Sequence, residues 1–263
     1  PQFHKPMVTP GEYELHGNVP IRKSVTIRAI RHGTVLFRLL DDATLVVSGP
    51  GGEEASQIGP VVLEGLRFEV PSDFAVVGQQ NWSEVVIRNS EFESTSRNLA
   101  PLAFAPAFVG DQRPTVEIVD SEVRSWGIFT LWAIGEEEAI SPRVLATSTI
   151  LQWTGPTGLT NLGGLNVTGS AAFEGRNLVI EGFSFPLMLG DSSTTSLSHS
   201  DVTEYDFAIS IDEMSTGADL TCNWWGSESG PSPTLGADPS VFSPWATEPV
   251  AGTSGRVSCT GGK

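Results

Sequence analysis

A short pattern of apolar and polar positions returns along the chain: an aliphatic strand segment, a small polar turn and a second apolar position. Its anchors lie at residues 27, 45, 63, 87, 118, 145, 173, 197 and 220, a spacing of roughly 24 residues. A second apolar run precedes several anchors, as at residues 74–78, 129–135 and 185–190. A propeller blade needs about 40 residues, whereas a β-helix rung closes with two or three short strands in the low twenties. The pattern therefore predicts two strands per turn of a solenoid, with helix below about a tenth of the residues.

The predicted fold is an all-β, right-handed single-stranded parallel β-helix of about nine rungs. We expect one domain over residues 1–263, with an N-terminal arm or cap at 1–23, rungs at 24–226 and a C-terminal cap or tail at 227–263. The 28 Gly and 18 Pro punctuate the chain with turns, while 39% hydrophobic residues suffice for a long core.

The charge of the chain excludes two classes of partner. A formal net charge of −16, from 31 acidic and 15 basic residues, repels nucleic acid and anionic membranes. No segment approaches a transmembrane stretch. The chain opens on Pro1 without a signal peptide, so we expect a mature secreted protein or a piece of a longer precursor.

Two cysteines bracket the C-terminal flank. We expect Cys222 and Cys259 to form a disulfide that fixes the tail to the last rung, which would stabilise the fold by about 3–4 kcal/mol. The alternative is a pair of buried free thiols. Asn81 and Asn166 each begin an N-glycosylation sequon, a weak signal in a chain rich in Ser and Thr.

The two ends resemble a known family. Residues 8–13 (VTPGEY) and 19–27 (VPIRKSVTI) resemble the opening of pectate-lyase-like right-handed β-helix proteins, and residues 223–231 (NWWGSESGP), followed by Pro244-Trp245, resemble the closing motif of many secreted β-helix proteins. The resemblance implies a right-handed helix and an exported protein. It implies little about chemistry, because this fold carries lyases, hydrolases, epimerases, adhesins and structural spikes.

Acidic residues follow the strands of successive rungs. The column contains Asp111, Glu136, Asp191 and Asp212. Stacked carboxylates repel one another unless they are hydrated, protonated or bridged by a hard cation such as Ca²⁺. Family members that cleave acidic polysaccharides use Ca²⁺ with a Lys or Arg base. Here such a lyase would have to recruit Arg113, Arg124 or Arg143. Solvated turn acids are the alternative, and no cofactor is required.

Two further columns are aromatic and polar. Trp126, Trp153 and Tyr205 each follow their anchors by eight residues, with Phe183 near the same phase. These rings would either stack on sugar faces or pack internally as a ladder. The polar turns Asn89-Ser90, Asp120-Ser121, Thr147-Ser148, His199-Ser200 and Cys222-Asn223 suit tight structural corners. His199, Ser200 and Asp201 cannot converge as a triad, because neighbours on a strand point to opposite faces. The four histidines lie too far apart for a zinc site.

Two functions fit these observations. The first is an extracellular, non-catalytic structural protein, a cell-surface, fibre or adhesin subunit that assembles with itself or other surface proteins through its ends, because a rung stack exposes unpaired edges. The arm at residues 1–10 would join rods head to tail. The second is a polysaccharide-active enzyme or a glycan-binding module that uses the acidic and aromatic columns.

Overall fold

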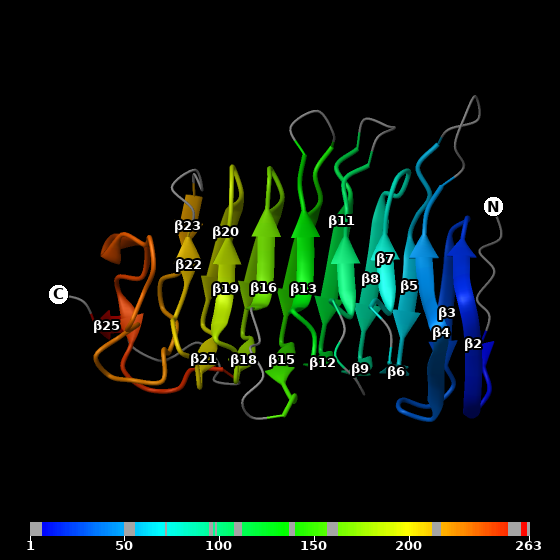
Figure 1. Ribbon diagram of the computed structural model, residues 1–263, viewed down its shortest axis with the longest axis horizontal. Coiled ribbons are helices and arrows are strands. Elements are labelled where there is room, and N and C mark those ends of the chain that lie inside the picture. Colours follow the sequence, from blue (N-terminus) through cyan, green and yellow to red (C-terminus); the bar gives the residue numbers. More distant parts are fainter. Residues whose placement is uncertain are drawn as a thin grey trace.

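Two large parallel sheets make up the molecule (Figure 1). The structure is a computed structural model that describes residues 7–49, 56–71, 73–94, 97, 99–107, 112–136, 140–156, 163–211, 217–251 and 259–261. The first sheet has nine strands, in the order β1 (Met7–Val8), β3 (Val25–Ala29), β5 (Val61–Glu64), β8 (Glu84–Arg88), β11 (Thr115–Val119), β14 (Arg143–Thr147), β17 (Ala172–Arg176), β20 (Thr194–Ser198) and β23 (Gly217–Asp219).

The second sheet has 14 strands and divides into two arms that meet at β4 (Val35–Val47), which also pairs with β2 (Gly11–Ile21). The first arm contains β6 (Leu66–Val70), β9 (Glu91–Ser94), β12 (Glu122–Ser125), β15 (Ile150–Trp153), β18 (Val179–Glu181) and β21 (Asp201–Thr203). The second arm contains β7 (Val76–Gly78), β10 (Leu102–Phe104), β13 (Phe129–Ile134), β16 (Gly163–Thr168), β19 (Phe185–Leu189) and β22 (Ser210–Ile211).

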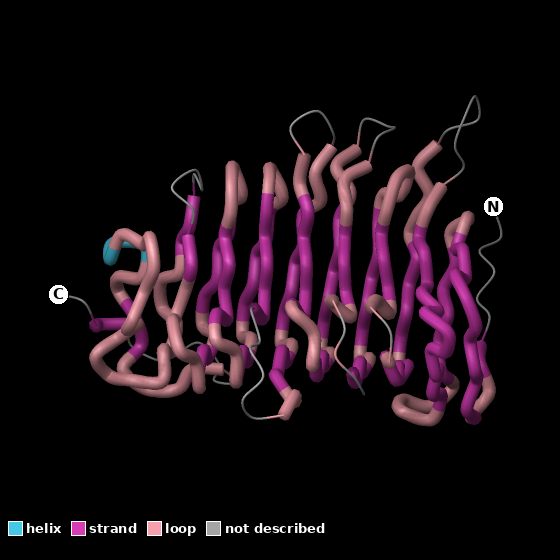
Figure 2. The backbone as a smooth tube through the Cα atoms, viewed as in Figure 1, coloured by secondary structure: helices cyan, strands magenta, loops and turns pink. Residues whose placement is uncertain are grey.

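Each central rung takes one strand from the nine-stranded sheet and one from each arm, as in β8, β9 and β10 (Figure 2). The fold is thus a parallel β-helix of about nine rungs, as predicted. The expectation of two strands per turn is wrong, because the rungs from β5 to β22 have three. Among the described residues the only helix is the three-residue 3-10 helix η2 (Pro239–Val241), and none is long and apolar enough to cross a membrane.

The registers of the two sheets correct three of the predicted anchors. Ala146 and Gly175 take the positions expected for residues 145 and 173. At Gly175 a Cβ atom would lie 2.7 Å from the Phe173 ring, so that ring fills the space an aliphatic anchor would occupy. Leu45 pairs with Val76 of the second arm and begins no rung, because β4 continues from one arm into the other through Asp41 and Asp42, which both have positive φ.

The corner between the nine-stranded sheet and the first arm is the same in most rungs. Its first residue has a positive φ: Gly65, Asn89, Asp120, Ser148, Asn177, His199 and Cys222. The predicted polar corners are confirmed, with one shift, since Ser148-Thr149 replaces Thr147-Ser148. The next side chain is buried and joins the rungs: Ser90 Oγ accepts from Leu66 N–H (3.3 Å), and Ser121 Oγ accepts from Ser90 N–H (3.2 Å).

The core is a continuous column of apolar side chains from β4 to the last rung. In β6 the buried and exposed positions alternate, as expected for a strand with one solvated face. Phe68 and Phe92 stack inside with ring centroids 4.7 Å apart, and Phe37 and Tyr13 extend this ladder toward the N-terminal end.

The two ends of the helix differ. At the C-terminal end Trp225 and Phe242 are buried and pack edge to face at 5.2 Å, and β24 (Trp245–Ala246) pairs with β25 (Cys259–Gly261). At the N-terminal end β1 and β2 already belong to the sheets. The described rungs therefore begin at residue 7 rather than at residue 24, and residues 1–6 of the predicted arm lie outside the described residues. No described strand covers the outer edge of β2.

Candidate functional site

The acidic column is only partly within the described residues. Asp111 and Asp212 lie outside them, and Glu136 and Asp191 are exposed. Both flank the turn at residues 169–170: Asp191 Oδ2 accepts from Gly169 N–H (3.3 Å), and Ser170 Oγ donates to the Glu136 carbonyl (3.1 Å). Among the described residues, no group of three or more His, Cys, Asp or Glu side chains could hold a metal ion. Calcium binding stays a prediction.

The three arginines considered as a lyase base are all engaged. Arg113 donates to the carbonyls of Ser141 and Ser170 (3.0 Å each), and burial lowers its pKa. Arg124 pairs with Glu122 and Arg143 with Glu174. Carbonyl or carboxylate oxygens hold each of these guanidinium groups in a structural contact, which makes the group unavailable as a base. This geometry therefore gives the lyase interpretation no support.

The predicted aromatic column does not form a single ladder. Trp153 lies in register with Ser125 rather than Trp126, and its ring covers Gly155. Trp126 is half-buried and Phe183 is buried. Tyr205 is half-buried and donates from Oη to the Trp225 carbonyl (2.7 Å). Desolvation raises its pKa. Stacking of a glycan on these rings stays a prediction.

Both sequon asparagines are largely covered. Asn81 is 4% exposed and Asn166 is 8% exposed. Asn166 lies within β16 rather than on a loop. N-glycosylation favours exposed loops, so the structure gives these sequons no support and glycosylation stays a prediction.

The residues 199–201 have structural contacts. Ser200 Oγ donates to the Ser198 carbonyl (3.0 Å), and Asp201 Oδ1 accepts from the N–H groups of Val250 and Ala251 (2.7 and 3.1 Å). Asp201 thus holds the C-terminal segment against the last rungs. The Ser200 contact stabilises the rung corner, and the Asp201 contacts hold the C-terminal segment. Neither set of contacts forms a nucleophilic triad.

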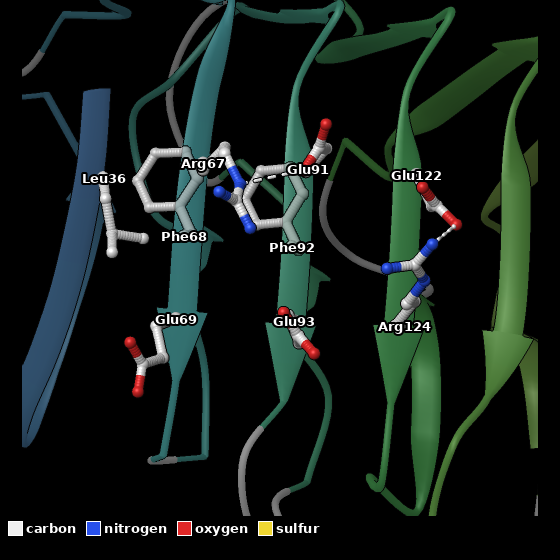
Figure 3. Close-up of a pocket in the computed structure, with 9 residues that line it drawn as sticks. All are labelled: Leu36, Arg67, Phe68, Glu69, Glu91, Phe92, Glu93, Glu122 and Arg124. Carbon is white, nitrogen blue, oxygen red and sulfur yellow. Dashed lines mark ion pairs between the residues drawn. The ribbon is translucent and has the colours of Figure 1, made fainter. Parts of the chain in front are cut away.

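A ladder of ion pairs covers the outward face of the first arm (Figure 3). Arg67 pairs with Glu91 at 2.9 Å and Arg124 with Glu122 at 2.7 Å. They line a hollow of about 190 Å³. Arg38 joins Glu12 and Glu69 of the two adjacent rungs. These charges are solvated and largely paired, and the pairs Arg67–Glu91 and Arg38–Glu69 join neighbouring rungs.

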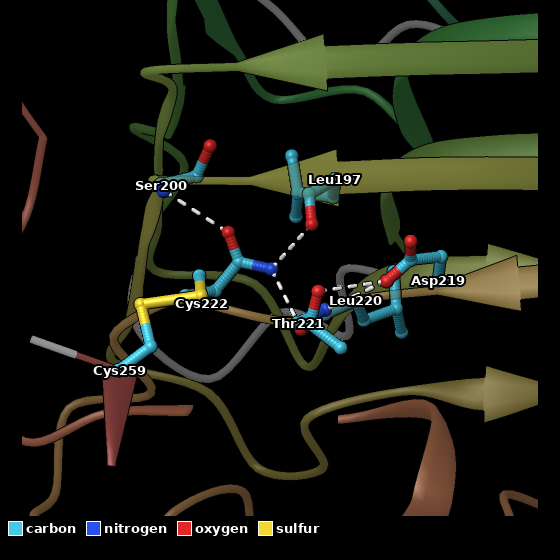
Figure 4. The surroundings of a disulfide bond; sticks show 8 residues. Leu197, Ser200, Asp219, Leu220, Thr221, Cys222 and Cys259 are labelled. Carbon is cyan, nitrogen blue, oxygen red and sulfur yellow. Dashed lines mark hydrogen bonds between the residues drawn. A yellow bond between two sulfur atoms is a disulfide. The ribbon is translucent and has the colours of Figure 1, made fainter. Parts of the chain in front are cut away.

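The predicted disulfide is confirmed. Cys222 and Cys259 are bonded across 37 residues, with Cα atoms 5.2 Å apart (Figure 4). Cys222 occupies the last corner, and the next residue, Asn223, is fully buried. The Asn223 amide accepts from Ser200 N–H (3.0 Å) and donates to the carbonyls of Leu197 (2.7 Å) and Leu220 (2.8 Å).

One apolar surface was not foreseen, namely the outward face of the second arm. Phe129 and Trp132 pack against each other at 5.5 Å, and Phe185 stacks on Phe207 at 5.2 Å. All four side chains are half-buried. The signal was present as apolar runs, such as 129–134, in which positions of both parities are apolar. Such runs define a strand but do not show which of its faces is covered.

A comparison of the chain with protein-family models, curated proteins and solved structures gives no match.

Proposed function

We propose that this protein is an extracellular, non-catalytic structural rod that associates through its N-terminal end. The observation that carries the proposal is the difference between the described ends. One is closed by a packed and disulfide-bonded cap, whereas at the other no described strand covers the edge of the long parallel strand β2. Natural β proteins cover such edges or use them for pairing.

The N-terminal edge has the features of an incomplete rung. Tyr13, Leu15 and Val19 of β2 point toward the core and pack against it, yet each stays partly exposed. In the next rung Leu39, the register partner of Leu15, is fully buried. A further β layer on this edge would bury the same positions of β2 and pair its backbone.

The contacts between rungs suit a rigid structural role. Corner hydroxyls tie neighbouring rungs, the core is continuous from end to end, and ion pairs cross between strands on two outward faces. Such contacts leave few low-cost routes for local opening.

Three further features support the proposal. A disulfide is stable in oxidising compartments, which favours an extracellular location. The ends resemble secreted, pectate-lyase-like right-handed β-helix proteins, and right-handed crossovers dominate among parallel strands. The acidic surface disfavours nucleic acid and membranes as partners. We place the protein with surface or fibre subunits rather than with polysaccharide lyases or epimerases.

Substitution of Leu15 by Lys tests the association. A charge pointing inward at the open edge blocks addition of a β layer, while a half-exposed lysine can still reach solvent. Sedimentation velocity should show concentration-dependent oligomers of the parent protein at physiological and molar salt, and only monomer for Leu15→Lys. Ile150→Lys, which adds the same charge at an exposed position (36%) on the side of the helix in β15, should associate like the parent.

Two results would refute this proposal. One is a parent protein that stays monomeric at the highest soluble concentration, and the other is release of unsaturated products from acidic polysaccharides in the presence of Ca²⁺. If Leu15→Lys loses its far-ultraviolet β spectrum, Val19→Lys replaces it. Pairing of two N-terminal edges closes as a dimer, whereas contact between an edge and a cap grows a filament, so the particle size distinguishes the two assemblies.

A further inference from the structure

The outward face of the second arm carries a shallow groove with an uncharged lining. Trp132, Asn166, Met188 and Ser210 occupy consecutive register positions on β13, β16, β19 and β22. Figure 1 shows these strands side by side. The groove has a volume of about 370 Å³, and its lining consists of Asn166, Thr168, Met188, Leu189, Gly190, Ser210 and Ile211.

Two polar groups on this face lack partners. Asn166 is only 8% exposed and lines the groove, yet its amide has no hydrogen-bond partner in the described part of the chain. In the adjacent rung Trp132 Nε1 is buried and has no partner among the described residues. The Asn166 amide, which lines the open groove, can both donate to and accept from a ligand.

Aromatic rings border the same face. Phe129 and Phe185 both lie in register with Gly163, and a Cβ atom on Gly163 would point at Met188 Sδ (3.1 Å). The three positions therefore share the outward side with Met188. Gly163 has no side chain, so its position on β16, between the Phe129–Trp132 pair and the Phe185–Phe207 pair, leaves an open space on this face.

We propose that this face binds a neutral saccharide. Aromatic faces pack against the apolar faces of sugar rings. One amide and two hydroxyls, those of Asn166, Thr168 and Ser210, offer both donors and acceptors, as sugar hydroxyl groups require. None of the described residues that line the groove is charged, and a net charge of −16 disfavours an anionic chain.

The sheet itself argues against a peptide as the ligand. Peptides that bind sheets add a strand at an open edge, whereas β16 pairs with β13 on one side and with β19 on the other. The face therefore offers side chains only. The saccharide site does not depend on the rod function, because the groove lies along the side of the helix and the open edge lies at its end.

Calorimetric titration with hexamers of neutral gluco-, manno-, xylo- and N-acetylglucosamine chains tests the proposal. A galacturonate hexamer serves as the anionic comparison. We expect the protein to bind at least one neutral hexamer. Asn166→Ala and Trp132→Ala should each weaken that binding about tenfold or more. Trp132→Phe, which keeps an aromatic ring at this position, should weaken binding less than Trp132→Ala. Trp126→Ala, an aromatic truncation away from the groove, should bind within about twofold of the parent.

Three results would overturn the saccharide site. They are no binding of any neutral hexamer at millimolar concentration, binding of the galacturonate hexamer alone, and equal binding by the parent and Asn166→Ala. Far-ultraviolet circular dichroism of each variant establishes that the β-helix is retained. Gly163→Ala supplies a second probe, because its methyl group fills the open space between the ring pairs without removing a polar group.

Discussion

At the scale of single residues, the corner positions determine how one rung follows the next. The left-handed backbone region costs a non-glycine residue about 1–2 kcal/mol, and Asn or Asp at these corners reduces that cost by local hydrogen bonding. Asn89 and Asp120 both have φ of 48°. The following Ser or Thr then bonds to a backbone group of the neighbouring rung. The last such position, Asn223, makes two of these bonds, to Ser200 and Leu197, and a third within its own rung, to Leu220.

Replacement of Asn223 by Ala should destabilise the protein strongly. It would leave the Ser200 N–H and the carbonyls of Leu197 and Leu220 without this partner in a fully buried place, at about 1–3 kcal/mol for each group left unpaired. We expect a loss of at least about 2 kcal/mol in equilibrium urea unfolding. Thr221→Ala, which removes only an exposed bond to Asp219, is the control, and an equal loss in both variants would contradict this account.

At the scale of elements, the sequence was sufficient to predict the strand repeat, but not which residue of each repeat occupies the inward anchor position. The β-helix, the scarcity of helix, the corners and the disulfide were predictable because each depends on local periodicity or spacing. The predicted anchor position is wrong in the rung of Gly175, because the Phe173 ring fills the core there in place of an aliphatic side chain. It is wrong again at Leu45, where β4 runs 13 residues through two arms.

The candidate sites were less predictable than the strands. The acidic and aromatic columns were derived by counting from anchors, so a shift of one residue moves a side chain to the other face of the sheet. Trp153 shows this error, since its register partner is Ser125 rather than Trp126. The groove at Asn166 was missed because sequence does not reveal which outward positions neighbouring loops leave open.

Removal of the disulfide tests the cap as an element. We expect Cys222→Ser with Cys259→Ser to lower the unfolding free energy by up to about 3–4 kcal/mol, the chain-entropy value for a loop of this length. Hydrogen exchange should accelerate in β23 and around Trp225 and Phe242, which pack beneath the tail, and stay unchanged in β8 and β11. The parent protein under reducing conditions is the matched control. Uniform acceleration across all rungs would show that the cap holds the whole helix rather than its last rung.

At the scale of the whole molecule, repulsion among acidic groups opposes local ion pairing. The Arg–Glu pairs, such as Arg38–Glu69 and Arg88–Glu117, are about 40% exposed, and exposed pairs contribute little. The 31 acidic residues exceed the 15 basic ones by more than two to one. Net repulsion along the rod should therefore outweigh the pairs at low ionic strength.

Raising NaCl from about 0.01 M to about 1 M shortens the Debye length from about 30 Å to about 3 Å, so we expect the melting temperature to rise over this range. A matched pair of exposed positions separates screening from other effects of salt. Glu248→Gln, which removes one negative charge, should melt above Lys23→Gln, which removes one positive charge, by a difference that reflects a few tenths of a kcal/mol. The two variants should converge at high salt, because screening removes the long-range field that distinguishes them. A melting temperature that falls with salt, or a difference that persists at about 1 M, would show instead that short-range pairs dominate the electrostatics of this helix.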